Sequence, residues 1–257
     1  MTSGIRPYYA SDGASAIHYD LITAQDRSLD GDIDLYAGLI PAGGSVLELG
    51  AGTGRIAIPL AERGFTVTGL DIAPSMLAQA EARRGALPDD VAARLRFVRG
   101  DMRSLALGQS FDAVIATFFT LAHVQPATAW EQVFAGIARH LRPGGRLAAH
   151  LPLVDKMIAT PPAAGSLLFQ TPTTDGDSLA LIFVEQNYAA KSGRFDLTLD
   201  YVLGTATGDE RSRSRERYTL FHGDPAPFAE RAGLRPMGEP LPLGTSGAVH
   251  IFEKPAV

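Results

Sequence analysis

The chain has 257 residues, of which 46% are hydrophobic, and its 23 basic and 28 acidic residues give a formal net charge of −5. That length allows one large domain or two small ones, and the acidic balance argues against a nucleic-acid partner. Because the chain has no cysteine, disulfides and thiolate metal sites are excluded, and no spacing suggests another metal site. The sequence has neither a signal-peptide pattern nor a membrane-spanning stretch, so we expect a cytoplasmic protein without a membrane partner.

The first two thirds of the chain predict an α/β domain. Residues 1–44 have no obvious strand, and residues 33–40 predict a short helix with Asp32 as its N-cap. Strands and helices then alternate, which predicts a parallel, doubly wound sheet with ligands at the carboxyl ends of its strands. The predicted strands are 46–49, 65–71, 95–101, 111–118 and 146–151, and the predicted helices are 55–63, 74–84 and 127–141.

The last third predicts a different organisation. Residues 160–177, with their Pro, Gly and Thr content, predict a mobile loop. Three long β-rich segments separated by short polar links follow, which indicates an antiparallel insert. A final predicted helix and a final predicted strand then complete the α/β core. The segments are 179–189, 194–205 and 214–222 for the insert, 225–234 for the helix and 247–255 for the strand. We therefore expect a lid over 1–44, a core over 45–160, an insert over 161–222 and completion of the core by 223–257.

Four arginines occupy alternate positions near the start of the last insert strand, at Arg211, Arg213, Arg215 and Arg217. Side chains alternate across a strand, so these four line one face. A solvated or edge-protecting face is favoured over a site for an anionic substrate or a partner.

The stretch VLELGAGTGR runs from an apolar strand into glycines at Gly50, Gly52 and Gly54. Glycines let the backbone take positive φ and leave no Cβ against a ligand. The dinucleotide fingerprint is Gly-x-Gly-x-x-Gly, whereas this loop has Gly-x-Gly-x-Gly with Glu48 before it. A pyrophosphate gains nothing from that carboxylate, but a cationic ligand does. Asp71 ends the next strand, where an acid can accept both hydroxyls of a ribose.

At this loop the chain resembles the class I S-adenosylmethionine-dependent methyltransferases, whose first motif is Glu-x-Gly-x-Gly-x-Gly. Residues 96–102, 111–124 and 141–152 resemble the family's third, fourth and fifth strands, in the same order. The resemblance implies an α/β fold with a Rossmann-like, doubly wound, seven-stranded sheet and an antiparallel β insert after the fifth strand. It also implies S-adenosyl-L-methionine as cofactor and S-adenosyl-L-homocysteine as product.

The resemblance assigns site residues as well. Asp101 would meet the adenine amino group and Met102 its ring, while Thr117 to Phe119 would lie beside the methionine moiety. The full set of cofactor-binding residues that it implies is Tyr19, Glu48, Gly50, Ala51, Gly52, Gly54, Arg55, Asp71, Ile72, Met76, Gly100, Asp101, Met102, Thr117, Phe118 and Phe119.

The order of N-terminal segment, core and late insert resembles the small-molecule branch of this family, such as glycine or sarcosine N-methyltransferases and amino-sugar N-methyltransferases. In that branch a leading helix with a pair like Tyr19-Asp20 and a stretch like 32–36 closes over the cofactor, and the insert roofs the acceptor pocket. Departures occur at Thr120, where serine is commoner, and at His150, where a carboxylate or Asn is often found. The oligomeric state stays open, with a homodimer as one option.

We therefore expect in-line methyl transfer to oxygen or nitrogen of a small-molecule metabolite, with positioning as the main source of rate. A base is needed only if the acceptor arrives protonated, and the candidates are His123, His150 and Tyr19. A lone histidine is more often structural than catalytic. Two alternatives stay open: an S-adenosylmethionine-binding protein that catalyses a cyclase or pericyclic reaction, and an NAD-dependent dehydrogenase. The lid, residues 1–30, is expected to order when cofactor binds, because no sheet anchors it.

Overall fold

The computed structural model describes residues 4–8, 10, 13–205 and 207–256. They group into two compact units. We call the residues up to Arg27 together with Val154–Phe221 the insert unit, and Ser28–Leu153 together with the residues from His222 onward the core unit. The predicted lid segment is thus divided in sequence at residue 27, within η1 (Arg27–Leu29).

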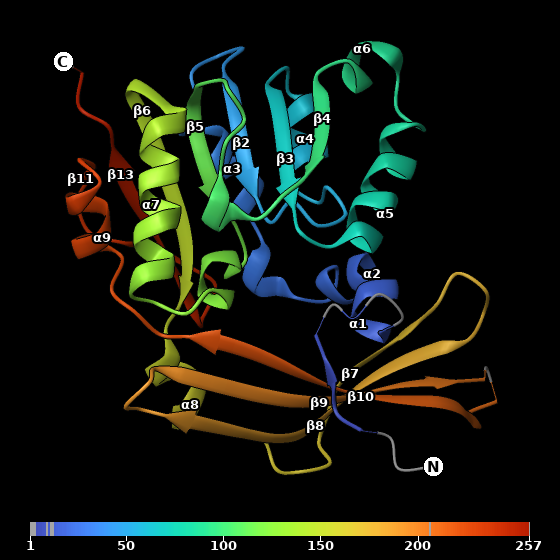
Figure 1. The fold of residues 1–257 in the computed structure, drawn as a ribbon. Coiled ribbons are helices and arrows are strands. Elements are labelled where there is room, and N and C mark those ends of the chain that lie inside the picture. The colour runs from blue at the N-terminus through green and yellow to red at the C-terminus, as the bar shows by residue number, and fades with distance from the viewer. Residues whose placement is uncertain (1–3, 9, 11–12, 206, 257) are drawn as a thin grey trace. The chain divides into compact units, whose positions relative to one another are not determined.

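The core unit contains a mixed β-sheet (Figure 1). Its strands run in the order β11-β13-β6-β5-β2-β3-β4, with β6 to β4 parallel and β13 antiparallel to β6. The described part of the sheet has eight strands where seven were predicted, because short β12 also pairs with β13. The strands are β2 (Ser45–Leu49), β3 (Thr66–Asp71), β4 (Leu95–Arg99), β5 (Phe111–Ala116), β6 (Leu141–Pro152), β11 (Arg235–Pro236), β12 (Leu241–Leu243) and β13 (Gly247–Glu253).

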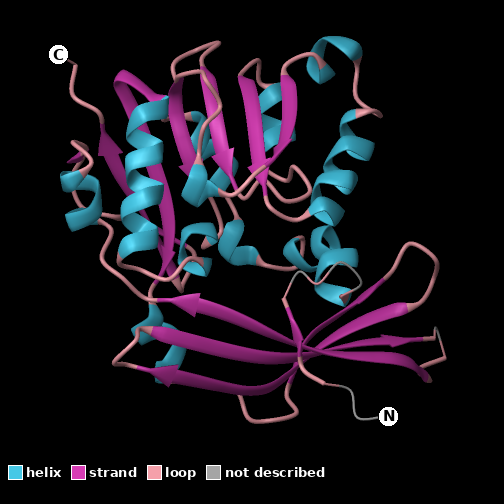
Figure 2. Cartoon of the chain, in the orientation of Figure 1, coloured by secondary structure: helices cyan, strands magenta, loops and turns pink. Residues whose placement is uncertain are grey.

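Helices cover both faces of this sheet, with α7 in front and α4 behind in Figure 2. Four residues of α7, Trp130, Val133, Phe134 and Ile137, follow helical spacing and are buried, which explains why this segment packs as an amphipathic helix. The helices and 3₁₀ turns are α3 (Asp32–Ala37), α4 (Ala57–Glu62), α5 (Pro74–Arg84), α6 (Asp89–Ala92), η2 (Met102–Ser104), η3 (Thr120–His123), α7 (Thr128–His140) and α9 (Ala226–Arg231).

The strand order places β2 at the centre of the sheet. From β2 the chain moves outward through β3 and β4, and then returns to the other side of β2 as β5. All of Val46 to Leu49 is buried, as expected for a parallel strand covered on both faces. Ligands bind where strand order reverses, so the loop after β2 lies at the predicted position for a cofactor.

One predicted cap is wrong. Gly31, with φ 85°, occupies the N-cap of α3, and Asp32 is the first helical residue. The Asp32 side chain makes no cap hydrogen bond, because it forms an ion pair with Arg55 instead.

The insert unit holds a second sheet in the order β1-β10-β9-β8-β7. The pairs among β7 to β10 are antiparallel, and β1 pairs parallel with β10. Apolar side chains gather on one face, in a cluster that includes Leu179, Leu181, Phe183 and Leu199. The elements are β1 (Arg6–Pro7), α1 (Ala14–Ile17), α2 (Tyr19–Thr23), α8 (Val154–Ala159), β7 (Leu167–Pro172), β8 (Ser178–Ala189), β9 (Arg194–Gly204) and β10 (Glu210–Phe221).

Two predictions about this unit are wrong. Residues 160–177 are not all loop, because β7 lies within them and pairs with β8. The N-terminal segment is anchored to a sheet, because Arg6 and Pro7 of β1 pair with Glu216 and Arg217. A two-residue strand whose partner lies 210 positions away in sequence has no periodicity to reveal it.

A buried carboxylate fastens the N-terminal segment to β10. Glu216 is 1% exposed, and its Oε1 accepts hydrogen bonds from the Ala14 amide at 2.7 Å and the Ser214 hydroxyl at 2.8 Å. The Ser15 amide also donates, at 3.3 Å to Oε2. These donors would have no acceptor in the apolar interior without this side chain.

We expect Glu216→Ala to lower the free energy of unfolding by about 2 to 3 kcal/mol, because buried donors to a charged acceptor lose their partner. Amide exchange at 14–23 should accelerate. Glu210→Ala is the matched control: Glu210 lies on the same strand with its side chain 48% exposed, and its loss should cost less than about 0.5 kcal/mol. Equal effects of the two substitutions on exchange would contradict this role for Glu216.

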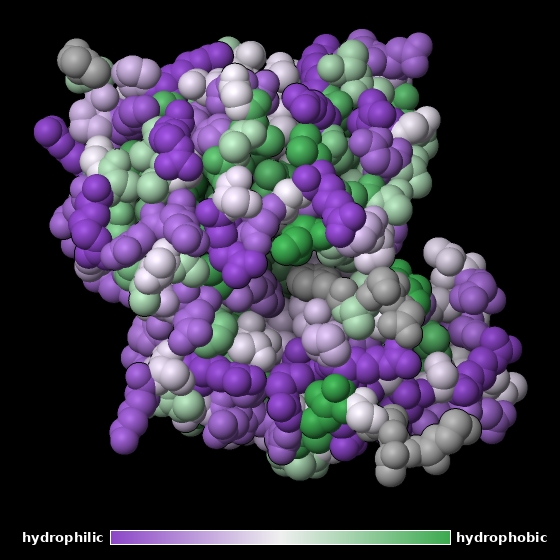
Figure 3. Space-filling model, viewed as in Figure 1, coloured by the Kyte–Doolittle hydropathy of each residue, from purple (hydrophilic) through white to green (hydrophobic). Residues whose placement is uncertain are grey.

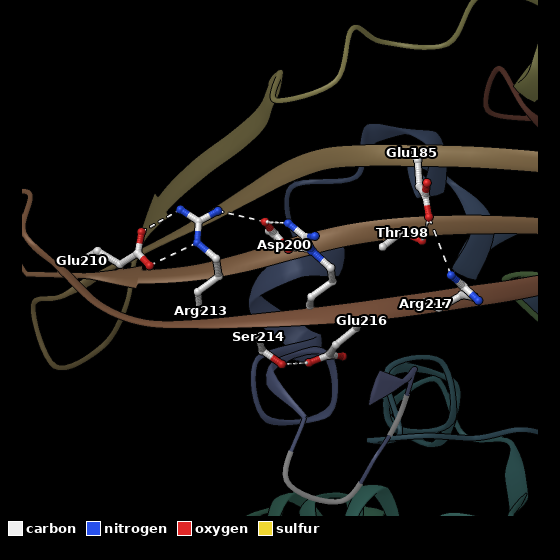
Figure 4. A network of polar contacts seen from close by, with 9 residues as sticks. Glu185, Thr198, Asp200, Glu210, Arg213, Ser214, Glu216 and Arg217 are labelled. Carbon is white, nitrogen blue, oxygen red and sulfur yellow. Dashed lines mark hydrogen bonds and ion pairs between the residues drawn. The ribbon is translucent and has the colours of Figure 1, made fainter. Parts of the chain in front are cut away.

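Arg213, Arg215 and Arg217 alternate along β10 as predicted, whereas Arg211 lies in a register shift near the start of the strand. Each of the four pairs with a carboxylate, and Figure 4 shows the pairs of Arg213 and Arg217. β10 lies between β1 and β9 in the sheet order, but the described β1 pairs only with Glu216 and Arg217, so edge protection stays a prediction for the other three arginines. The visible face of this sheet is mainly hydrophilic in Figure 3. The partners are Asp177 for Arg211, Asp200 and Glu210 for Arg213, Asp200 for Arg215, and Glu185 for Arg217. The stripe is thus charge-compensated, which favours the solvated-face interpretation.

Candidate functional site

The glycine loop after β2 has the geometry that the motif predicts. Gly50, Gly52 and Gly54 have φ values of 69°, 55° and 81°. The amides of Gly50 and Ala51 donate to the Leu70 carbonyl at 2.7 and 3.0 Å, which holds the loop across the end of β3. These glycines therefore adopt the left-handed conformation that other residues avoid.

Asp71, the last residue of β3, organises the loop. Its Oδ2 accepts the Gly52 amide at 2.8 Å, and its Oδ1 accepts the Ala73 amide at 2.8 Å. Burial raises the pKa of Asp71, and the backbone amides oppose that shift. The carboxylate thus joins the glycine loop to the segment that starts α5. The next residue, Ile72, is 60% exposed, which leaves an apolar side chain available at this end of the strand.

Glu48 lies at the centre of the site with little compensation for its charge. The side chain is 1% exposed, and its Oε1 accepts a hydrogen bond from the Thr117 hydroxyl at 3.2 Å. Among the described residues, nothing donates to Oε2. Burial raises the pKa of Glu48 to about 8, although the Arg55 charge and the Thr117 hydroxyl both lower it.

Two residues of α3 complete this buried polar group, and neither was assigned a contact from the sequence. Asp32 accepts from Arg55 at 2.7 Å, and the hydroxyl of Tyr36 is buried with no partner among the described residues. Burial, followed by the Asp32 charge, raises the pKa of Tyr36. The short resemblance over 32–36 was the only signal for them. The Arg55 guanidinium also lies over the Phe118 ring, 6.0 Å from its centroid.

The segment after β5 is strained. Phe118 and Phe119 both have positive φ, at 42° and 64°, a conformation that is costly for bulky residues and concentrates at functional sites. Phe119 packs against His150 with ring centroids 4.6 Å apart. Thr120 then begins η3, and its methyl group would lie 2.4 Å from a Cβ at Gly50. The predicted neighbours Thr117 to Phe119 therefore lie beside the glycine loop.

His150 is enclosed at the end of β6. It is 1% exposed, and neither ring nitrogen makes a hydrogen bond of normal geometry with a described residue. A Cβ on Gly247 of β13 would lie 2.1 Å from its Nε2. Burial and then the Arg55 charge lower the pKa of His150 to about 4, although the Leu243 backbone opposes the shift. These features favour a structural role over a role as general base.

Protonation of His150 should make stability depend on pH. The unfolded chain binds a proton near pH 6.5, whereas the folded ring binds one only near pH 4, so stability is lost as pH falls through this window. The shift corresponds to about 3 kcal/mol. Between pH 7 and pH 4, urea unfolding of the wild type should therefore lose about 3 kcal/mol more than that of His150→Leu. Parallel stability profiles of the wild type and His150→Leu would mean that the folded ring binds its proton at the same pH as the unfolded chain.

The remaining predicted residues lie in several places. Asp101 accepts the Arg103 amide at 2.9 Å and pairs with its guanidinium, and this side chain lowers the pKa of Asp101. Met102 begins η2. A Cβ on Gly100 would lie 2.9 Å from Leu70 Cδ1, so a larger residue there would have to displace the end of that side chain. The other predicted residues are Met76, which is buried in α5, His123, which ends η3, and Tyr19, which is buried in α2 of the insert unit.

The described residues contain neither a cluster of metal ligands nor a membrane-spanning helix. Nowhere in that part of the chain do three His, Asp or Glu side chains gather as metal ligands would. None of its helices is long and apolar enough to span a membrane.

Comparison with known proteins identifies the domain. Residues 46–145 match the family described as a methyltransferase domain. Cypemycin N-terminal methyltransferase from Streptomyces sp is 39% identical over 113 residues, which cover 44% of this chain and 43% of the relative. An S-adenosyl-L-methionine-dependent Diels-Alderase, iccD of Talaromyces variabilis, is 37% identical over 113 residues, covering 42% and 36%. A dTDP-3-amino-3,4,6-trideoxy-alpha-D-glucopyranose N,N-dimethyltransferase from Streptomyces venezuelae is 32% identical over 112 residues, covering 44% of each chain.

These matches span less than half of the length of each relative. Solved structures resemble nearly the whole chain. The CcbJ methyltransferase from Streptomyces caelestis has a TM-score of 0.74 at 21% identity and covers 97% of this chain and 99% of its own. CalS10 from Micromonospora echinaspora, an amino pentose methyltransferase with S-adenosylmethionine bound, has a TM-score of 0.69 at 22% identity over 93% and 96%. Residues 46–145 therefore match a methyltransferase domain, and the chain as a whole has the fold of these solved methyltransferase structures.

Proposed function

We propose that this protein transfers a methyl group from S-adenosylmethionine to nitrogen or oxygen of a small-molecule acceptor. The observation that carries the proposal is the Glu48 carboxyl, which is buried beside a glycine loop and has one oxygen with no partner among the described residues. An orphaned acidic oxygen suits a cationic ligand, and S-adenosylmethionine carries both a sulfonium and an ammonium group. The bound cofactor supplies a methyl group that is already activated for displacement.

The residues present fit this cofactor. Gly50 and Gly52 hold the loop in the left-handed conformation of the motif, and Asp71 retains acceptor capacity for ribose hydroxyls beyond the two amides that it binds. Exposed Ile72 offers an apolar surface for a base ring. Asp101 reaches an adenine amino group only if one oxygen is shared with Arg103, since both its oxygens already contact that guanidinium.

The acceptor class rests on the relatives and on charge. One relative's name specifies N,N-dimethylation of a dTDP-linked amino sugar, and another's specifies an N-terminal methyltransferase. With a net charge of −5, the chain lacks the basic surplus that nucleic-acid binding needs. A small molecule that carries an amino or hydroxyl group is thus the favoured acceptor. The lid over 1–44, the acceptor cover over 161–222, the homodimer and the cytoplasmic location stay predictions.

Methyl transfer requires alignment more than proton transfer. The core unit supplies rigid parts for alignment: the loop held by Asp71, and the strained Phe118 and Phe119 beside it. An acceptor amine that arrives protonated needs a base, and His123 and Tyr19 remain the candidates for that role. Enclosed His150 is better suited to holding the Phe119 ring in place.

The proposal is tested by incubating the protein with methyl-labelled S-adenosylmethionine and a panel of amino sugars, amino acids and matched hydroxyl analogues. Label should appear in the acceptor, and S-adenosylhomocysteine should form in equal amount. Binding of NAD without binding of S-adenosylmethionine would instead support a dehydrogenase.

The match to a Diels-Alderase keeps a second candidate open, a reaction that uses this fold without methyl transfer. Tight S-adenosylmethionine binding with no labelled product from any acceptor would favour this candidate.

A further inference from the structure

The Glu48 carboxyl lacks the partners that a buried carboxylate needs. Ionised carboxylates in protein interiors are paired with a cation or accept several hydrogen bonds, because removing the charge from water is costly. Glu48 is 1% exposed, accepts only the Thr117 hydroxyl and leaves Oε2 without a described donor. A protonated carboxyl avoids most of this cost, since the neutral form needs far less solvation.

The surrounding charges act on Glu48 in both directions, because Arg55 favours its ionised form whereas Asp32 and Asp71 favour its neutral form. The groups that act on Glu48 are Asp32 and Tyr36 of α3, Arg55 after the glycine loop, Asp71 of β3 and Thr117 after β5. Arg55 is the one cation among them, and its guanidinium is paired with Asp32 at 2.7 Å. An ionised Glu48 would add a third carboxylate to this group.

We propose that Glu48 holds a proton in the ligand-free protein and loses it when a cationic ligand binds at the glycine loop, so that cofactor binding releases a proton. In this step the O–H bond of the carboxyl breaks, its electron pair stays on the carboxylate, and the proton passes to solvent. The positive charge of the ligand replaces the proton as the partner of Glu48. This inference rests on the proposed function, because it takes S-adenosylmethionine as the ligand.

Such an exchange makes binding depend on pH in a definite direction. Burial raises the pKa of Glu48 to about 8 in the ligand-free protein. Below that pH the ligand must displace a proton, so affinity should rise up to about tenfold per pH unit. Above it the carboxyl is already ionised, and this contribution to affinity should level off. A neutral ligand at the same loop should show none of this dependence.

The test is calorimetry of S-adenosylmethionine binding at pH 6.5 and pH 9, in buffers with different ionisation enthalpies, which gives the number of protons released. Glu48→Gln is the matched variant, because glutamine keeps the shape but has no proton to release in this range. At pH 6.5 the wild type should release close to one proton more than the variant. At pH 9 the two should differ little. The ligand's own ionisation cancels in this comparison.

Two further measurements test whether Glu48 is the source of the released proton. Adenosine, the neutral part of the cofactor, should bind without this proton release. Thr117→Val removes the hydroxyl that stabilises the carboxylate, so its affinity should level off at a higher pH than that of the wild type. Equal proton release by wild type and Glu48→Gln, or an unchanged profile in Thr117→Val, would overturn the inference while the proposed function stands. Failure of the wild type to bind S-adenosylmethionine at any pH would overturn both.

Discussion

Asp71→Ala should weaken S-adenosylmethionine binding by about 1 to 3 kcal/mol, which is about 5- to 150-fold. The substitution has two physical effects. It removes an acceptor for ribose hydroxyls, and it leaves the amides of Gly52 and Ala73 without the oxygens that they contact at 2.8 Å. The loop then loses a bond that fixes its conformation before the ligand arrives, so ordering it adds to the cost of binding.

Two variants separate these effects. Asp71→Asn keeps one acceptor oxygen but replaces the other with a donor, so its loss of affinity should lie between those of the wild type and Asp71→Ala. Asp34→Ala removes an acid that is 77% exposed and pairs with Arg63, and it should leave affinity unchanged. Isothermal titration of all four proteins provides the measurement. Wild-type affinity in Asp71→Ala would remove Asp71 from the site.

The central part of the fold could be predicted because local pattern and tertiary role agree there. Helix α5 is predicted to the residue, since Pro74 suits the first helical position and the basic Arg83 and Arg84 suit the last turn. Strands β2 and β3 are mostly buried apolar runs, as expected for parallel strands covered on both faces, and they are followed by Gly50 and end at Asp71 respectively. The glycine spacing then predicts a loop in which Gly50, Gly52 and Gly54 all have positive φ, as they do.

The parts that were predicted wrongly depend on pairing partners that the local sequence pattern does not reveal. Arg6 and Pro7 form a strand only because β10 offers its edge, and β7 forms in a Pro- and Gly-rich stretch because β8 pairs with it. Asp32 was predicted to cap a helix from local preference, but its carboxylate pairs with the Arg55 guanidinium instead. An ion pair between two segments leaves no mark on local sequence.

The candidate site likewise combines residues that the sequence predicted with contacts that it could not predict. The glycines and Asp71 belong to a sequence motif and were predicted. The burial of His150 was not predicted. Nothing in the sequence shows that Gly247 closes against its Nε2, because this contact is made across two strands. Likewise, the motif identified Glu48 but could not show that one of its oxygens would lack a partner.

Gly50→Ala should have the other large effect on the loop, and the chain offers a matched control for it. Gly43 and Gly50 have nearly equal φ values, 67° and 69°, so alanine at either position bears a similar conformational cost of about 1 to 2 kcal/mol. Their surroundings differ. A Cβ on Gly43 meets nothing within 4 Å, whereas one on Gly50 lies 2.4 Å from Thr120 Cγ2 and 2.7 Å from Thr120 Oγ1.

The difference between the two variants therefore isolates the steric clash. Gly43→Ala should lower the free energy of unfolding by about 1 to 2 kcal/mol and leave S-adenosylmethionine affinity unchanged. Gly50→Ala should lose about 1 to 3 kcal/mol more, because overpacking forces Thr120 or the loop to move. Since the loop is the proposed binding surface, its displacement should also lower affinity at least about tenfold. Urea unfolding and calorimetry measure the two quantities.

Truncating Thr120 tests directly whether its side chain causes the loss of affinity. In Gly50→Ala combined with Thr120→Ala, the contacts at 2.4 and 2.7 Å disappear, and only the Thr120 Cβ remains, at 3.2 Å. The double variant should then recover most of the lost affinity while it keeps the φ strain. Comparison with each single variant gives the coupling energy, which should be favourable and larger than about 0.5 kcal/mol. Additive effects would mean that Thr120 does not limit the loop, and that the positive φ alone requires glycine at this position.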